Sequence, residues 1–216
     1  MAAVEVQVWS DFACPWCALG LARLDVARRE FEHGDQVHVV HRSYELHPRA
    51  RATSDLNMVD AIAAKYGTTA ERVRVHNEHL TMLGRDVGLE LDFERVRLGS
   101  TFDAHRLAHA ARGTDGEEVL LRGLFRAYFT EGRLLSDHGV LREVAAAAGL
   151  DDSLTEKVLA GDMYAREVRI DESDALELDV TGVPYFLING SWPIPGAQDV
   201  DTLVTVLRRA WSRLEH

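Results

Sequence analysis

The chain has little cysteine, with only Cys14 and Cys17 among 216 residues, and this excludes the disulfide scaffold of a small secreted domain. Its 16 glycines and 5 prolines form no linker between two independent domains. No low-complexity run interrupts a hydrophobic fraction of 46%, which is ordinary for a globular protein. We therefore expect one ordered chain with a sizeable core.

An excess of positive charge and long apolar runs are also absent. The 24 basic residues against 35 acidic ones give a net charge of -11, which argues against nucleic acid or an anionic membrane as a partner. No stretch reaches the length of a transmembrane helix, and Met1 to Glu5 contains no basic region before an apolar one. We expect a cytoplasmic protein. Leu214-Glu215-His216 resembles a vector scar and is given no function.

The first forty-odd residues show the pattern of a βαβ unit. Val4, Val6 and Val8 alternate with polar residues, as in a strand. Apolar residues from Pro15 to Phe31 recur on one helical face, and the run from Val37 to Tyr44 predicts a second strand. A right-handed crossover makes the two strands parallel.

The middle of the chain, from about residue 53 to 178, has almost only helical pattern. We expect helices from residue 56 after a cap at Asp55, and then over 69–87, 102–112, 116–130, 137–148, 153–160 and 164–178. Afterwards Pro184 to Ile188 predicts a strand, Asn189-Gly190 a hairpin turn and Ser191 to Ile194 its partner. Asp199 or Asp201 then caps a final helix.

This order of elements predicts an α/β protein with a thioredoxin-like fold (βαβ... ββα) and a large all-helical insertion. Residues 1–50 and 179–216 are expected to form the thioredoxin-like domain, and residues 51–178 the helical insertion domain. A structured connection of this length is usually functional, so the insertion is expected to cover the active-site side of the core.

The segment Cys14-Pro15-Trp16-Cys17 carries the expected chemistry. At a strand-to-helix turn Cys14 would be the N-cap, where free N–H groups and the helix dipole stabilise a thiolate and lower its pKa. We predict that Cys14 is the exposed nucleophile and that Cys17, one turn on and buried, resolves the mixed disulfide. A nearby Asp11 carboxylate would act against a low pKa.

Two other interpretations of the cysteine pair are a buried inert pair and half of a zinc site. Zinc requires four ligands, and only His76 and His79 form an obvious helical histidine pair. The strand-turn-helix context favours redox chemistry, so neither a metal nor a bound cofactor is expected. Four further histidines are interpreted as strand and loop surface: His33, His38, His41 and His47.

A second motif, Thr181-Gly182-Val183-Pro184, stands just before the predicted C-terminal strand. From its place in the fold we predict a cis bond before Pro184, although trans is the more common form. Such a turn would offer the Val183 backbone to an extended substrate beside Cys14.

Residues outside the two motifs admit a functional and a structural interpretation. A helix carrying His105 and Arg106 could cover the redox site and contact substrate, or the two side chains could simply be paired within the protein. Trp9, Phe12 and Trp16 flank the cysteines and could form an apolar platform or part of the core.

The motifs together resemble the DsbA family, especially its FrnE-like branch. The segments that carry the resemblance are Ser10-Asp11-Phe12-Ala13-Cys14-Pro15-Trp16-Cys17, Phe102-Asp103-Ala104-His105-Arg106-Leu107, Gly182-Val183-Pro184-Tyr185-Phe186 and Pro195-Gly196-Ala197-Gln198. The resemblance implies a nucleophilic first cysteine, a resolving second cysteine and a cis-proline opposite them. Trp16 stands where the exported DsbA enzymes carry histidine, and no signal peptide is expected. The resemblance is therefore to branch members without export signals, which are associated with cytoplasmic redox work and secondary-metabolite pathways.

The predicted function is therefore thiol-disulfide exchange, with Cys14 and Cys17 catalytic and Trp16, Val183, Pro184 and His105 binding substrate. The expected substrate is a protein or small-molecule thiol or disulfide. The sequence does not decide whether glutathione is a co-substrate, nor whether the chain forms a homodimer. The alternative is a glutathione-dependent isomerase or transferase of the kappa-type or 2-hydroxychromene-2-carboxylate isomerase group. A third hypothesis is a chaperone or interaction module that uses the apolar surface around Trp16.

Overall fold

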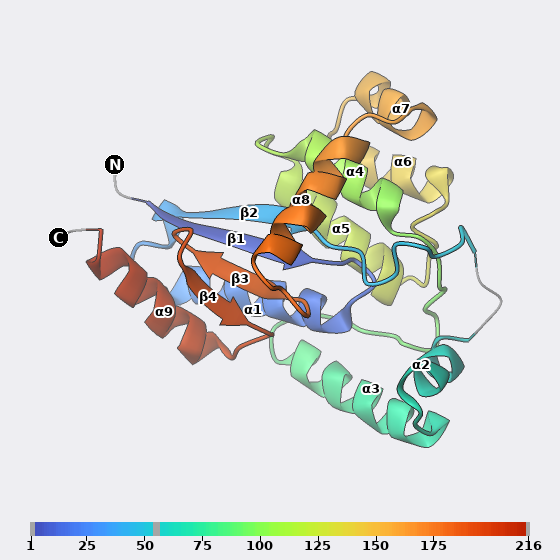
Figure 1. Cartoon of the computed structure of the whole chain (residues 1–216), viewed down its shortest axis with the longest axis horizontal. Coiled ribbons are helices and arrows are strands. Elements are labelled where there is room, and N and C mark those ends of the chain that lie inside the picture. Colours follow the sequence, from blue (N-terminus) through green and yellow to red (C-terminus); the bar gives the residue numbers. More distant parts are fainter. Residues whose placement is uncertain (1–2, 54–56, 215–216) are drawn as a thin grey trace.

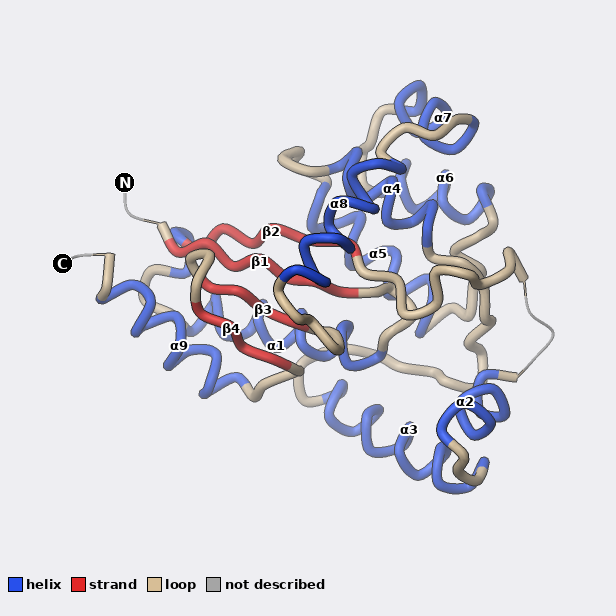
Figure 2. Tube along the Cα trace, viewed as in Figure 1, coloured by secondary structure: helices blue, strands red, loops and turns tan. Residues whose placement is uncertain are grey.

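A four-stranded mixed sheet lies at the centre of the computed structural model, which describes residues 3–53 and 57–214. Its strands are β1 (Val4–Ser10), β2 (Val37–Ser43), β3 (Tyr185–Ile188) and β4 (Trp192–Pro195). They are arranged in the order β2-β1-β3-β4 (Figure 2). The predicted parallel pairing of β1 with β2 and the predicted hairpin of β3 and β4 are both confirmed, and β3 lies antiparallel to β1.

The described residues form helices close to the predicted ranges. These are α1 (Pro15–Glu30), α2 (Met58–Tyr66), α3 (Ala70–Arg85), α4 (Phe102–Ala111), α5 (Glu117–Phe129), α6 (His138–Ala147), α7 (Asp152–Ala160), α8 (Ala165–Glu177) and α9 (Val200–Ser212). The predicted cap at Asp55 lies outside the described residues. Asn57 caps α2 through its side chain, and Asp199, not Asp201, caps α9.

The sheet is covered by helices on both faces (Figure 1). Val4, Val6 and Val8 point into one buried cluster with α1 and α9, because side chains two positions apart share a face of a strand. Trp9 points to the opposite face, where its indole N–H donates to the Asp171 carbonyl of α8 at 2.8 Å. The alternation read from the sequence therefore separates the two layers of helices.

The helices of the insertion gather at the end of the sheet where β1 finishes and α1 begins (Figure 1). Phe12, Cys14 and Cys17 belong to the same buried cluster as Leu107 of α4 and Leu124 of α5. The insertion thus covers the active-site end of α1, as predicted. The division at residues 50 and 178 stays a prediction, since this cluster spans it. No helix within 3–53 or 57–214 has the length and apolar character to cross a membrane.

Candidate active site

The first turn of α1 positions the two cysteines. Cys14 is the N-cap residue, and its sulfur accepts a hydrogen bond from the Cys17 backbone N–H at 3.4 Å. Pro15 occupies the first helical turn, where its missing N–H removes no helical hydrogen bond. The sulfur of Cys14 therefore lies at the positive end of the helix dipole, as the sequence predicted.

Both cysteines are free thiols, and both are buried. Cys17 has an exposed fraction of 0% and Cys14 of only 5%, so the predicted exposure of Cys14 is wrong. The reason is the packing of the insertion and of Val183 around the first turn of α1. Burial raises the pKa of the Cys17 thiol well above its usual value, and the hydrogen bond with Cys14 raises it further.

The segment before β3 lies directly against Cys14. The Val183–Pro184 peptide bond is cis, in agreement with the prediction. The Cys14 thiol donates to the Val183 carbonyl oxygen at 3.6 Å. A methyl group placed on Gly20 of α1 would lie 2.9 Å from Pro184 Cγ, so only a glycine leaves room for this approach. The structure thus brings Cys14, Cys17, Val183 and Pro184 together.

Trp16 is the one of the three flanking aromatic residues that stays half-buried. Its ring lies against His76 of α3, with 5.7 Å between the ring centroids. Trp9 and Phe12 are buried, which favours the core interpretation for both residues. Any apolar platform beside the cysteines is therefore built on Trp16.

A buried carboxylate, that of Asp11, organises the loop in front of the cysteines. It accepts hydrogen bonds from the Leu46 N–H at 2.7 Å, the Thr101 hydroxyl at 2.8 Å and the Ala13 N–H at 3.2 Å. Burial alone would raise the pKa of Asp11, but the interaction with His105 and these hydrogen bonds outweigh it and leave the pKa lowered. The ionised carboxylate ties the cysteine loop to the insertion.

His105 and Arg106 of α4 are both buried. His105 Nε2 lies 3.5 Å from Asp11 Oδ1, and the His105 ring contacts Phe12. This side chain faces the buried network with an exposed fraction of 2%, so its predicted contact with substrate stays a prediction without support from this placement.

Arg106 has the structural role that the sequence left open. Its guanidinium pairs with Asp103 at 2.7 Å. It also donates to three carbonyl oxygens in the last turn of α7 and the connection to α8, those of Val158, Gly161 and Met163. It therefore fastens the end of α7 and the α7–α8 connection to α4.

The histidines of the zinc interpretation lie apart from the cysteine thiols. His76 and His79 are exposed on α3, and His76 reaches Trp16 rather than a sulfur. Within the two described ranges, no group of three or more His, Cys, Asp or Glu side chains has a geometry that could hold a metal.

A second buried carboxylate, Asp171 of α8, was not found from the sequence. It accepts from Arg42 at 2.8 Å and from the Ser43 N–H at 2.9 Å, and it lies 3.0 Å from His109 Nε2. Burial opposes its ionisation, yet the bonds from His109, Ser43 and Arg42 leave its pKa lowered. These partners come from β2 and α4, which are far from α8 in the sequence, so no local sequence pattern predicts their contact with Asp171.

A Cys-x-x-Cys pair at a helix N-terminus, facing a cis-proline just before an inner strand of a mixed sheet, defines the thioredoxin-like class of proteins. Comparison of the chain with known families agrees with this class and identifies one family within it. The DSBA-like thioredoxin domain matches residues 5–208. The chain therefore belongs to the DsbA-like thioredoxin family, with a helical insertion in the fold.

Solved structures resemble this chain over nearly its whole length. A probable DsbA oxidoreductase, SCO1869 from Streptomyces coelicolor, is 38% identical with a TM-score of 0.91, covering 97% of this chain and 90% of its own. The cytosolic disulfide reductase DsbM from Pseudomonas aeruginosa is 19% identical with a TM-score of 0.65, covering 95% and 97%. A 2-hydroxychromene-2-carboxylate isomerase is 16% identical with a TM-score of 0.65, covering 97% and 95%. The last two show the fold alone.

Proposed function

We propose that this protein is a thiol-disulfide oxidoreductase of the FrnE-like branch, in which Cys14 is the nucleophile and Cys17 the resolving thiol. One observation carries the proposal: the Cys14 sulfur lies between the Cys17 N–H at 3.4 Å and the Val183 carbonyl at 3.6 Å. The first contact stabilises negative charge on sulfur, and the second marks where a substrate chain pairs beside it. The family supports thiol-disulfide chemistry in general.

The reaction has two exchange steps. In the first, the Cys14 thiolate attacks one sulfur of a substrate disulfide, the substrate S–S bond breaks, and the leaving sulfur takes up a proton. In the second, Cys17 loses its proton, attacks the Cys14 sulfur and releases the remaining substrate thiol. Two electrons pass from the protein to the substrate, and an external dithiol or two thiols restore the pair. The reverse sequence oxidises a substrate dithiol.

The raised pKa of Cys17 gives the steps their order. A buried thiol that stays protonated does not compete with Cys14 for the substrate disulfide. It becomes the better attacking group only when a mixed disulfide stands beside it. Because Cys14 is only 5% exposed, a substrate can reach little of its surface in this structure.

Partners and compartment follow as part of the proposal. We propose that the substrate is a protein or small-molecule disulfide, with glutathione as a co-substrate and no bound cofactor. In this proposal Trp16, Val183 and Pro184 bind the substrate, and His105 is the fourth substrate-binding residue. We propose a cytoplasmic location; one protein that shares the fold is a cytosolic disulfide reductase. A homodimer is compatible with these roles, whereas nucleic acid and membrane are not proposed as partners.

The decisive experiment traps the mixed disulfide. Cys17→Ser treated with oxidised glutathione should gain one glutathione on Cys14, measured by intact-protein mass, whereas Cys14→Ser should gain none. Reduction of insulin disulfides should be lost in Cys14→Ser. Insulin reduction at the parental rate by Cys14→Ser would refute the assignment of the nucleophile.

A glutathione-dependent isomerase is the second candidate, favoured by the fold shared with a 2-hydroxychromene-2-carboxylate isomerase. Such an enzyme binds reduced glutathione without a covalent bond and does not use Cys17. It therefore predicts isomerase turnover unchanged in Cys17→Ser, together with no insulin reduction by the parent. We expect the opposite on both counts, since disulfide exchange needs a resolving thiol within reach.

A further inference from the structure

A large cavity lies on the side of α1 away from the Val183 segment. Its volume is about 930 Å³, within the range of small-molecule sites, and its walls come from α1, β2, α5 and the chain after α3. Apolar side chains dominate these walls: Leu21, Val39, Val87, Leu89, Leu121 and Phe125. Neither Cys14 nor Cys17 lines it.

Two buried side-chain atoms in the walls have no hydrogen-bond partner. They are Arg28 Nε and His41 Nδ1, two of the four such side-chain atoms in the part of the chain that the structure describes. An unpaired buried donor or acceptor destabilises the folded protein, so two of them in the wall of one cavity point to a missing polar partner. A ligand oxygen would satisfy both.

Charge at this end of the cavity favours an anionic oxygen. Burial lowers the pKa of His41 to about 4, and the positive charges of Arg112 and Arg28 contribute more than Glu118 returns. His41 is therefore neutral at pH 7 and stands in a locally positive field. Arg112 also fixes it, by donating to the His41 carbonyl oxygen at 2.6 Å.

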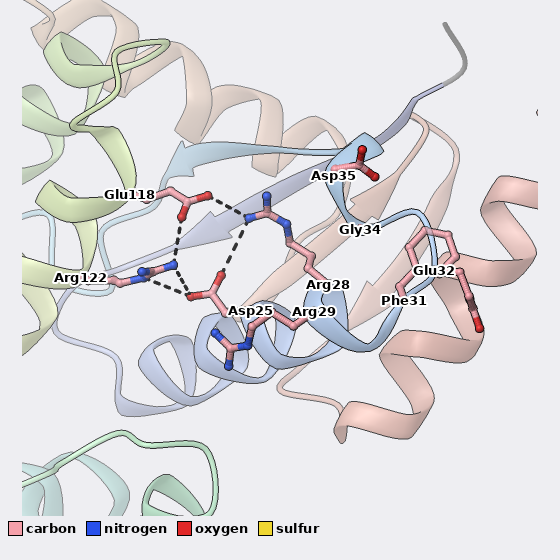
Figure 3. A pocket seen from close by; sticks show the side chains of 9 residues that line it. All are labelled: Asp25, Arg28, Arg29, Phe31, Glu32, Gly34, Asp35, Glu118 and Arg122. Carbon is pink, nitrogen blue, oxygen red and sulfur yellow. Dashed lines mark hydrogen bonds and ion pairs between the residues drawn. The ribbon is translucent and has the colours of Figure 1, made fainter.

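The remaining charges at the mouth neutralise one another. Figure 3 shows a quartet in which Arg28 and Arg122 each contact Asp25 and Glu118. The quartet carries no net charge, and it holds the Arg28 side chain in the cavity wall. Glu90, Asp115 and Glu117 line the cavity as well, so net charge alone does not select the ligand.

We infer that this cavity is a second binding site, separate from the cysteines, for an amphipathic carboxylate: an organic acid whose apolar body fills the cavity and whose carboxylate meets Arg28 and His41. The apolar walls supply most of the affinity through burial, and the two unpaired groups orient the head. Phe125 lines the cavity, and its ring contacts that of Phe12, with 5.1 Å between the ring centroids. The Phe125 ring therefore separates the body of the ligand from the loop that carries the cysteines.

Decanoate and the neutral decanol are suitable probes, titrated calorimetrically into the full chain. We expect saturable 1:1 binding of decanoate and about tenfold weaker binding of decanol. Ala22→Phe places a ring in the cavity from α1 and should weaken decanoate at least about tenfold. The same substitution at the exposed Ala64 of α2 is the matched control and should change nothing.

Substitution of each of the two arginines in the quartet distinguishes loss of the carboxylate contact from general destabilisation of the protein. Arg28→Gln should weaken decanoate about tenfold, whereas Arg122→Gln, which loses the same ion pairs but no unpaired atom, should weaken it less than about threefold. Val119→Trp repeats the filling test from α5 if Ala22→Phe unfolds. Cys14→Ser should bind decanoate like the parent, because this site does not depend on the proposed redox function.

Absence of saturable decanoate binding to the parent would overturn the inference. So would parental affinity in the folded filling variants, since the ligand would then lie elsewhere. Equal affinity for decanol and decanoate, or equal losses in Arg28→Gln and Arg122→Gln, would overturn the assignment of a carboxylate.

Discussion

The two halves of α1 are built differently. Its first turn is closely packed, with Cys14 and Cys17 in a buried cluster above the Asp11 network. Its later turns, from Ala18 to Arg29, border the 930 Å³ cavity along one face, and its second half is joined to α5 by a half-exposed ion quartet. Buried short contacts fix geometry because few alternatives exist for them, whereas exposed ion pairs exchange readily with water. The comparison indicates that rigidity is concentrated where the sulfurs are positioned.

Removal of Asp11 should have the largest effect on stability. In Asp11→Ala the Leu46 N–H, the Ala13 N–H and the Thr101 hydroxyl lose their shared acceptor. We expect the free energy of unfolding to fall by about 3 kcal/mol, measured by urea denaturation. Asp11→Asn is the control, because it keeps one oxygen acceptor and should lose less. If Asp11→Ala lowered the free energy of unfolding no more than Arg122→Gln in the ion quartet, the proposed contrast between the two halves of α1 would be wrong.

Gly20→Ala tests how tightly the first half of α1 meets the Pro184 segment. Helix propensity alone would stabilise the variant by about 1 kcal/mol. The new methyl would lie 2.9 Å from Pro184 Cγ and 3.4 Å from Phe186 Cζ, within a buried region. We expect a net loss of about 2 kcal/mol and slower insulin reduction, since Val183 must move from Cys14. Stabilisation of the variant would show that this packing is loose.

His41, in the wall of the cavity, should make the free energy of unfolding depend on pH. The pKa of His41 is lowered from 6.5 to about 4 in the folded protein, so the unfolded chain binds the extra proton between these values. Stability from this neutral histidine is complete above pH 6.5 and is lost as the pH falls toward 4, by about 1.4 kcal/mol per pH unit at most.

The measurement compares unfolding free energies of the parent and His41→Gln at pH 6.5 and 5.5. The parent should lose about 1 kcal/mol more than the variant over this interval. His38 is an exposed histidine on the same strand, and His38→Gln should keep the parental loss. Identical pH dependence in the parent and His41→Gln would contradict the burial of His41.

The ion quartet should show the smallest effect. Arg122→Gln removes contacts to Asp25 at 3.0 Å and to Glu118 at 2.9 Å, but these side chains remain partly in water. We expect a loss of about 0.5 kcal/mol, which disappears in 1 M salt because the charges are screened. A loss above about 2 kcal/mol would mean that both halves of α1 are held with equal strength.

Much of the fold was predictable because its signals are local. Alternation in β1, the positive φ angles of Asn189 and Gly190 in the hairpin turn, and the Asp199 cap all depend on neighbouring residues. The place of Cys14 at the start of α1 follows from the same local chemistry. Asp55, the one predicted cap that could not be compared, lies outside the described residues.

The sequence by itself determined the order of elements, the thioredoxin-like class and the pairing of Cys14 with Cys17, because backbone conformation and periodicity act over a few residues. Tertiary structure alone decided that Cys14 is buried, that Asp11 meets Thr101, and that Asp171 meets His109. Those partners are 90 and 62 positions apart in the chain, so their contact depends on how whole helices pack. The cavity beside α1 has the same origin, since an unfilled volume exists only between elements that have already been placed.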